Sequence, residues 1–345
     1  MTFPEVVGRA ARGISATLAR LRVDPYIAAI LCTVGIAAMC PARGVTANFL
    51  DRAGTVAIVV LFFFYGARLS TAEALRGLRH WRLHAAITTV TFAVFPLLAV
   101  ACAPLAPAVL REPLYAGIVF LCVLPSTVQS SITLTSIARG NEAGAICSAS
   151  LSSVLGVVLT PVLAAALMSA GGGGFSLGSV GDITVRLLLP FLAGQVAQRW
   201  IGDRVRARRR LLSLYDRAVI LLVVYTAFSL GVVAGVWRGL APRELAALAL
   251  VVAALLAVAL AVAALLARAA GFSREDRIAA LFCGSQKSLA SGLPMASVLF
   301  AGAALSTVVL PLMLYHQMQL LVCSWLAQRF AARPAALPEP VRAAA

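Results

Sequence analysis

Between two apolar runs of this chain lies the segment Cys283-Gly284-Ser285-Gln286-Lys287-Ser288-Leu289-Ala290-Ser291-Gly292-Leu293-Pro294. It contains Lys287, the only lysine of the protein; every other basic residue is an arginine, and nearly all of these fall between apolar runs. An ammonium group at bilayer depth costs from about 2.5 to over 10 kcal/mol, so it is kept mainly where it faces a bundle interior or an aqueous cavity. Lys287 therefore indicates a functional position inside a membrane-embedded bundle.

The composition of the 345-residue chain is that of a membrane protein. Hydrophobic residues make up 61% and charged residues 12%, the mean hydropathy is +0.95, and apolar runs recur from end to end. The sequence therefore predicts an all-α membrane protein surrounded by a lipid bilayer. A formal charge of +16 would suggest nucleic acid as the partner of a soluble chain. Here the arginines cluster in short loops, as the positive-inside rule describes, so no nucleic-acid partner is expected.

Proline, glycine and arginine punctuate the apolar runs and delimit ten predicted membrane helices. They lie at residues 25–40, 53–67, 84–103, 114–137, 143–169, 182–198, 218–236, 244–267, 278–301 and 304–327. With the N-terminus in the cytoplasm, the arginines expected on the outer side are only Arg43, Arg52, Arg111, Arg238 and Arg243. This asymmetry predicts a multi-pass protein of the plasma or inner membrane with both termini in the cytoplasm.

Ten helices divide into two sets of five. Because five is odd, the second set enters the membrane from the opposite side, which makes an inverted repeat. The predicted organisation is a cytoplasmic N-terminal segment (1–23), a first five-helix repeat (24–170), a Gly-rich outer linker (171–181), a second five-helix repeat (182–329) and a cytoplasmic tail (330–345).

The fourth predicted helix of each half carries a polar interruption. In the first half it is Pro125–Ser136, and in the second it is the Lys287 segment. Transporters built from inverted repeats place their site near the midplane, where such broken helices meet. We expect the broken helices 4 and 9 to cross, with unwound backbone and half-helix ends facing a cavity.

Four motifs resemble those of a known family. They are Phe62-Phe63-Phe64-Tyr65-Gly66-Ala67-Arg68-Leu69, Pro125-Ser126-Thr127-Val128-Gln129-Ser130-Ser131, Ser136-Ile137-Ala138-Arg139-Gly140-Asn141 and Tyr315-His316-Gln317-Met318-Gln319-Leu320. Together they resemble the bile acid:sodium symporter superfamily, and more narrowly its SBF-like branch, over about residues 24–330. The resemblance implies a core domain of helices 3–5 and 8–10, a panel domain of helices 1, 2, 6 and 7, and crossing broken helices 4 and 9.

The chain departs from the sodium-coupled members of that family. In them, a glutamate and a glutamine on helix 9 help to bind sodium; the matching positions here are Ser285 and Leu289. Only Ser130 and Ser131 keep side chains that could bind the ion, and they are weak candidates. All 13 acidic residues are expected in loops or at helix ends. No carboxylate is therefore expected at the membrane centre to neutralise sodium, a hard cation that prefers oxygen ligands.

This absence suggests a role for Lys287. We hypothesise that its ammonium occupies roughly the place of the missing sodium, held by Ser and Gln oxygens and by the carbonyl-rich end of the first half of helix 9. It either stays charged as a built-in cation or cycles protons. A charged Lys287 without an internal carboxylate would favour an anionic substrate.

The candidate substrate- or ion-binding residues are Lys287, Gln286, Ser285, Ser288, Gln129, Ser130, Ser131, Thr133, His316 and Gln317. Each has a structural alternative. Lys287 could snorkel from a position nearer the interface, the hydroxyl and amide groups could join helices, and His316 could be a satisfied packing residue. No metal-ligand spacing or catalytic set appears at membrane depth, so neither an enzyme nor a resident cofactor is expected.

The sequence favours a secondary transporter of a small organic anion that works by alternating access. The alternative is a regulatory or scaffold membrane protein that acts on ion homeostasis without direct flux. Substrate identity, transport direction, the coupling ion (proton or sodium), the protonation state of Lys287 and the oligomeric state stay open at this stage.

Overall fold

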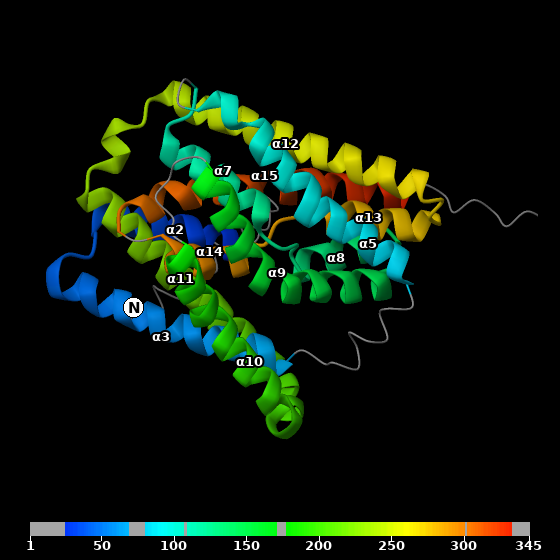
Figure 1. Ribbon diagram of the computed structural model, residues 1–345, viewed down its shortest axis with the longest axis horizontal. Helices are drawn as coiled ribbons and strands as arrows, with labels where there is room; N and C mark the ends of the chain where they lie inside the picture. The colour runs from blue at the N-terminus through cyan, green and yellow to red at the C-terminus, as the bar shows by residue number, and fades with distance from the viewer. Residues whose placement is uncertain (1–24, 69–79, 107–108, 171–176, 301, 333–345) are drawn as a thin grey trace, which may run out of the picture.

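A computed structural model describes residues 25–68, 80–106, 109–170, 177–300 and 302–332, in which every regular element is a helix (Figure 1). Up to residue 170 the elements are α2 (Pro25–Met39), α3 (Gly44–Arg68), α5 (Trp81–Thr89), η2 (Val90–Val94), α6 (Phe95–Ala101), η3 (Ala103–Leu105), α7 (Glu112–Val123), α8 (Gln129–Ile137) and α9 (Glu142–Ala170). They continue as α10 (Leu177–Ala207), α11 (Arg209–Val233), η4 (Val236–Gly239), α12 (Pro242–Ala269), α13 (Arg274–Ser285), α14 (Leu289–Leu299) and α15 (Ala304–Ala332). The all-helical expectation is confirmed.

Several helices are longer than the apolar runs that predicted them. Helix α3 begins at Gly44 rather than near residue 53, and α10 begins at Leu177, inside the predicted linker. A charged residue such as Arg52 ends an apolar run without ending a helix, because arginine is a good helix former. Residues 1–23 and 171–176, and the tail beyond Ala332, lie outside the described residues.

Six of the described helices are long and apolar enough to cross a membrane. They are Gly44–Arg68, Trp81–Leu105, Glu142–Met168, Arg209–Val233, Pro242–Ala269 and Ala304–Ala332. Shorter apolar helices occur at Ala28–Met39 and Glu112–Val123. The parts of the two interrupted helices, α7 with α8 and α13 with α14, are individually too short to span a membrane.

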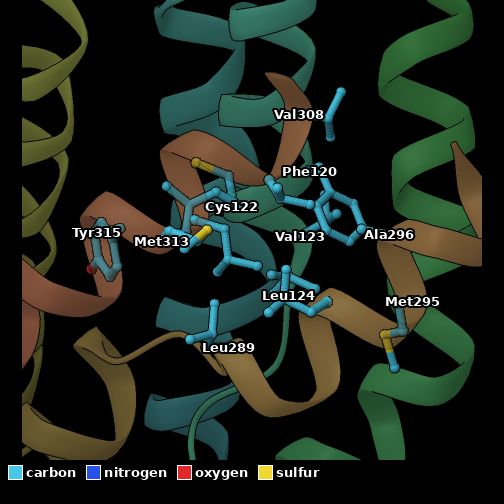
Figure 2. Packing of buried hydrophobic residues seen from close by; sticks show 14 of the residues in the cluster. Phe120, Cys122, Val123, Leu124, Leu289, Met295, Ala296, Val308, Met313 and Tyr315 are labelled. Atoms are coloured by element: carbon cyan, nitrogen blue, oxygen red, sulfur yellow. The ribbon is translucent and has the colours of Figure 1, made fainter. Parts of the chain in front are cut away.

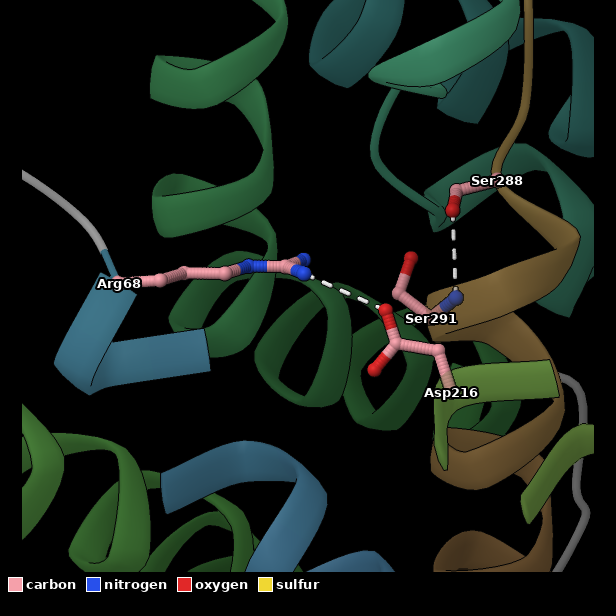
Figure 3. Close-up of polar contacts among 4 residues, drawn as sticks. All are labelled: Arg68, Asp216, Ser288 and Ser291. Atoms are coloured by element: carbon pink, nitrogen blue, oxygen red, sulfur yellow. Dashed lines mark hydrogen bonds and ion pairs between the residues drawn. The ribbon is translucent and has the colours of Figure 1, made fainter. Parts of the chain in front are cut away.

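Both predicted interruptions are present, and each has a local cause. Pro125 has no N–H to continue a helix and pushes the residue before it out of the helical region, so Leu124 is extended (φ −72°, ψ 152°). In the second interruption Gln286 is extended (φ −88°, ψ 148°), and the Ser288 hydroxyl accepts a hydrogen bond from the N–H of Ser291 at 3.2 Å (Figure 3). This serine cap begins α14.

The third predicted helix also departs from regular α geometry. Its middle, η2, is a π-helix in which the N–H of Phe95 bonds to the carbonyl of Val90. Pro96 follows and donates no hydrogen bond. As a result the carbonyl of Thr91 loses its α-helical partner, Phe95, and its π-helical partner, Pro96. A π-segment of this kind is frequent at functional positions.

The helices make two groups of contacts. In one, α3 packs along α10, and α11 packs against α2 and α3. In the other, α7 packs against α9 and α15, while α12 contacts α13 and α15. Figure 1 shows α12 along the upper edge of the molecule and α3 with α10 at the lower edge. Helix α11 touches α14 and α15 and so connects the groups.

An ion pair joins two helices of the first group. Arg68 of α3 forms an ion pair with Asp216 of α11 at 3.2 Å (Figure 3). The Arg68 guanidinium also lies 4.4 Å from the ring centroid of Tyr65. Arg68 remains 41% exposed, so this pair contributes little to stability.

Apolar packing surrounds the first interruption. Phe120, Cys122 and Leu124, at the end of α7, are fully buried. Figure 2 shows them among side chains of α14 and α15, including Leu289 and Met313. Lipid tails are themselves apolar, so this packing stabilises the bundle through close van der Waals contact rather than through removal from water.

Two glycines allow the close approach of α3 and α10. A Cβ atom on Gly66 would overlap the main-chain oxygen of Phe191, and one on Gly194 would overlap the main-chain oxygen of Phe63. The contact is therefore reciprocal. Small residues of this kind let the backbones of membrane helices touch.

We predict that Gly66→Ala lowers the stability of the protein. The added methyl group must push α10 away, at a cost of about 1–3 kcal/mol for overpacking. Gly54→Ala is the matched control on the same helix, because its Cβ would meet no atom within 4 Å. Thermal unfolding in detergent measures the difference. Equal melting temperatures for the two variants would contradict the packing described here.

Candidate functional site

The two helix interruptions lie against each other. The N–H of Ser288 donates to the carbonyl of Pro125 at 2.9 Å, and the hydroxyl of Ser126 donates to the carbonyl of Cys283 at 2.5 Å. Each interruption thus supplies a donor to the other. Unwound backbone at membrane depth is tolerated only where other protein groups or water satisfy it, and here the protein does so.

Helix α9 supports the first interruption from behind. The N–H of Ser126 donates to the Ser152 hydroxyl at 2.9 Å, and the Thr160 hydroxyl donates to the carbonyl of Val123 at 2.8 Å. Gly156 admits the ring of Pro125, because a Cβ there would lie 2.6 Å from it. Since Ser126 bonds to Ser152, the carbonyl of Cys122 has lost its regular helical donor.

Lys287 fills the space between α7 and η2. Its Nζ donates to the carbonyls of Thr91 (2.9 Å), Cys122 (3.0 Å) and Leu124 (2.7 Å). It also lies 3.9 Å from the ring centroid of Phe95, a cation–π distance. The residue is fully buried. An ammonium has three hydrogens to donate, and all three are used.

These partners differ from those expected. We expected Ser and Gln oxygens and the carbonyl end of α13, but the ammonium bonds to the carbonyl end of α7 and to η2. The reason is that carbonyls at the end of α13 already accept hydrogen bonds from other residues. The carbonyl of Cys283 accepts from Ser126, and the carbonyl of Ser285 accepts from the Tyr315 hydroxyl at 2.6 Å.

Gln319 of α15 fixes the backbone of Lys287. Its Oε1 accepts from the N–H of Lys287 at 2.8 Å, and its Nε2 donates to the carbonyl of the same residue at 3.0 Å. This pair of bonds replaces the helical bonds that residue 287 lacks. Nε2 of Gln319 also lies 2.9 Å from Nδ1 of His316. Gln319 therefore sets the direction from which the lysine side chain leaves the chain.

A cluster of hydroxyl groups surrounds Gln286. Its Oε1 accepts from Thr127 (2.8 Å), Ser130 (2.6 Å) and Ser131 (3.1 Å), and the hydroxyls of Thr127 and Ser130 also bond to each other. A carbonyl oxygen has two lone pairs, so it accepts two of these hydroxyls in good geometry. Two hydroxyls bonded to Oε1 and the bond between Thr127 and Ser130 use the three hydroxyl hydrogens. Nε2 of Gln286, in contrast, is buried with no hydrogen-bond partner among the described residues, so this amide group is available to a ligand. We call Thr127, Ser130, Ser131 and Gln286 the hydroxyl cluster.

The structure brings only some of the predicted site residues together. Ser130, Ser131 and Gln286 meet in the hydroxyl cluster, while the Lys287 side chain has a separate set of partners. Ser285 donates to the carbonyl of Leu281 at 2.7 Å within its own helix, and Ser288 caps α14.

The remaining predicted site residues lie on α8 and α15. Gln129 and Thr133 are exposed on α8. On α15, His316 and Gln317 are half-buried, and Nδ1 of His316 lies 2.9 Å from Nε2 of Gln319.

Some residues at the interruptions were not among the predicted site residues: Ser126 bonds to the carbonyl of Cys283, and three others also contribute. Thr127 belongs to the hydroxyl cluster, and Tyr315 and Gln319 hold the second interruption. The last two are four residues apart and so share one face of α15. The four-residue spacing of Tyr315 and Gln319 could have indicated a shared polar face. The neighbouring polar residues His316 and Gln317 made that spacing hard to recognise.

The interrupted helices, the buried ammonium and the apolar spans together define a multi-pass membrane protein with the construction of a secondary transporter. Residues 24–332 match the SBF-like CPA transporter family, and the chain belongs to that family. It is therefore a transporter of the bile acid:sodium symporter family with a small solute as substrate, and the resemblance noted in its motifs is confirmed. Such transporters are not enzymes.

Relatives in bacteria and vertebrates are similar over most of their length. The chain is 49% identical over 315 residues to the uncharacterized protein PA2026 of Pseudomonas aeruginosa, which covers 91% of this chain and 95% of the relative. It is 43% identical over 308 residues to YfeH of Escherichia coli (89% and 93%). It is 29% identical over 314 residues to sodium/bile acid cotransporter 7 of Rattus norvegicus (89% and 92%).

We predict that Gln319→Met destabilises the protein. The substitution keeps the length of the side chain but leaves the N–H and C=O of Lys287 buried without partners, each costing about 1–3 kcal/mol. Gln317→Met is the control, because no bond from Gln317 to the interruption occurs among the described residues. Thermal unfolding in detergent compares the two. A Gln319→Met protein as stable as the control would show that the two bonds are dispensable.

Proposed function

We propose that this protein is a secondary transporter of a small organic anion that works by alternating access. The observation that carries the proposal is the meeting of two polar helix interruptions around a buried ammonium. Among the described residues, no carboxylate bonds to that ammonium or to the hydroxyl cluster. A site with a positive charge, hydroxyl donors and no acidic partner favours an anion over a cation.

The proposed architecture is ten membrane helices in two inverted five-helix repeats. It is supported by the order of the elements: when α2 and α10 are each counted as the first crossing of a half, the fourth crossing of each half is the interrupted one. The two groups of helix contacts support a panel domain (α2, α3, α10 and α11) and a core domain formed by the other helices. Movement of the panel against the core would expose the interruptions to each side of the membrane in turn, with both termini on the cytoplasmic side.

Lys287 is proposed to replace sodium as the positive charge of the core domain, either as a built-in cation or as a proton carrier. The contacts of the residues at the two lost sodium positions support this proposal. Ser285 uses its hydroxyl within its own helix, and Leu289 is apolar and buried. Ser130 and Ser131, the remaining weak sodium candidates, are bonded to Gln286.

In liposomes, we predict that flux of an organic anion persists when sodium is replaced by choline. Lys287→Met should lower that flux by at least about tenfold, because it leaves three buried carbonyls without a donor, and each tenfold corresponds to about 1.4 kcal/mol. Carboxylates, sulfonates and steroid-like anions form the substrate panel. Strict dependence on sodium, or an undiminished flux in Lys287→Met, would contradict the built-in charge. A protein that carries no anion yet binds another protein tightly would favour a regulatory role.

The hydroxyl cluster is proposed to contact the anion, which predicts a loss of affinity in Ser130→Ala. An anion that stabilises the wild type raises its melting temperature by mass action. The concentration needed for half of that effect should rise by about tenfold in Ser130→Ala, as expected for the loss of one hydrogen bond of about 1–1.5 kcal/mol. Ser136→Ala, on the exposed face of the same helix, is the control. Equal affinities in the two variants would exclude Ser130 from the binding site.

A further inference from the structure

Three main-chain carbonyls and one aromatic ring form a closed surrounding for a cation. We call the oxygens of Thr91, Cys122 and Leu124, together with the ring of Phe95, the carbonyl cage. Two of these oxygens have lost their helical donors to specific defects. The π-segment and Pro96 remove the donors of the Thr91 oxygen, and the Ser152 hydroxyl accepts the N–H of Ser126 that would bond to the Cys122 oxygen. These defects, rather than the lysine itself, leave the oxygens of Thr91 and Cys122 without a helical donor.

The geometry of the cage fits the charged amine. A neutral amine has two hydrogens and a lone pair, so one of the three carbonyls would face the lone pair instead of a donor. The ring face of Phe95 also attracts a cation and not a neutral amine. Tyr315 supports this ring edge-on, with the centroids 6.1 Å apart.

The distances select the size of the cation. The three oxygens lie 2.7–3.0 Å from Nζ. Ca²⁺, whose ionic radius is close to that of sodium, takes oxygen ligands at about 2.3–2.6 Å. Carbonyls held by packed helices cannot all close in on so small an ion. Ammonium and potassium ions fit the observed spacing, and carbonyl rings are known to replace the hydration shell of potassium.

We propose that the carbonyl cage is a binding site for an ammonium-sized monovalent cation, which Lys287 fills permanently. Lys287 is then a positioning residue: with every hydrogen bonded to the cage, it offers none to a substrate and acts on the site through the two interruptions. The role of Lys287 in transport rests on the proposed function, and the carbonyl cage makes that role a built-in charge rather than a proton carrier. The cage itself is testable without any transport assay.

The test uses chemical rescue of Lys287→Ala. The substitution removes three carbons and the amine, and n-propylammonium has the same atoms. We expect n-propylammonium to raise the melting temperature of Lys287→Ala by at least about 2 °C and to leave that of the wild type unchanged. Potassium should give a smaller rise, and sodium and 1-propanol none. Equal stabilisation by 1-propanol, or by sodium, would overturn the cage, as would an n-propylammonium effect on the wild type.

Two further comparisons keep the outcome decisive. Lys287→Met fills the space with an uncharged side chain of similar length, so rescue of this variant would show that the amine binds elsewhere. If Lys287→Ala accumulates poorly, its yield from cells grown with n-propylammonium or with 1-propanol replaces the melting temperature; equal yields overturn the inference. Anion flux is measured last. If n-propylammonium stabilises Lys287→Ala but the wild type transports no anion, the proposed function is refuted while the carbonyl cage is supported.

Discussion

One ammonium shared by three carbonyls is the interaction on which the centre of this structure depends. A buried charge without partners costs several kcal/mol, and a buried carbonyl without a donor costs about 1–3 kcal/mol. Lys287 and the oxygens of Thr91, Cys122 and Leu124 remove both penalties together. Without such a donor, an apolar bundle would tolerate neither the break at the end of α7 nor the π-segment η2.

The surrounding structure follows from the need to hold that donor in place. Gln319 fixes the backbone of Lys287, and Tyr315 both supports Phe95 and bonds to the carbonyl of Ser285. Hydroxyls of α9 bond to the N–H of Ser126 and to the carbonyl of Val123 at the first interruption. The consequence is a rigid junction between α7, α9, η2 and α15. On this junction the hydroxyl cluster is the part with hydrogen-bonding capacity to spare.

The sequence predicted the features that depend on residue type. Pro125 and the polar run around Lys287 marked both interruptions, and four motifs indicated the family, which residues 24–332 confirm. It did not predict the partners of Lys287, because the sequence does not distinguish the carbonyl end of α7 from that of α13. Only the packing shows that Ser126 and Tyr315 already donate to carbonyls at the end of α13. The π-segment was also not predicted. The sequence of Val90–Val94 fits an ordinary membrane α-helix, and only Pro96 signals a departure from it.

Because Lys287 is the only lysine, its amine can be observed directly in the intact protein. Labelling with ¹⁵N at the lysine side-chain amine gives a single side-chain signal in nuclear magnetic resonance. The account predicts a protonated amine whose three hydrogens exchange slowly with water and whose signal does not change when sodium is added. A neutral amine, or an ammonium in rapid exchange with bulk water, would contradict the claim that the carbonyl cage holds this charge.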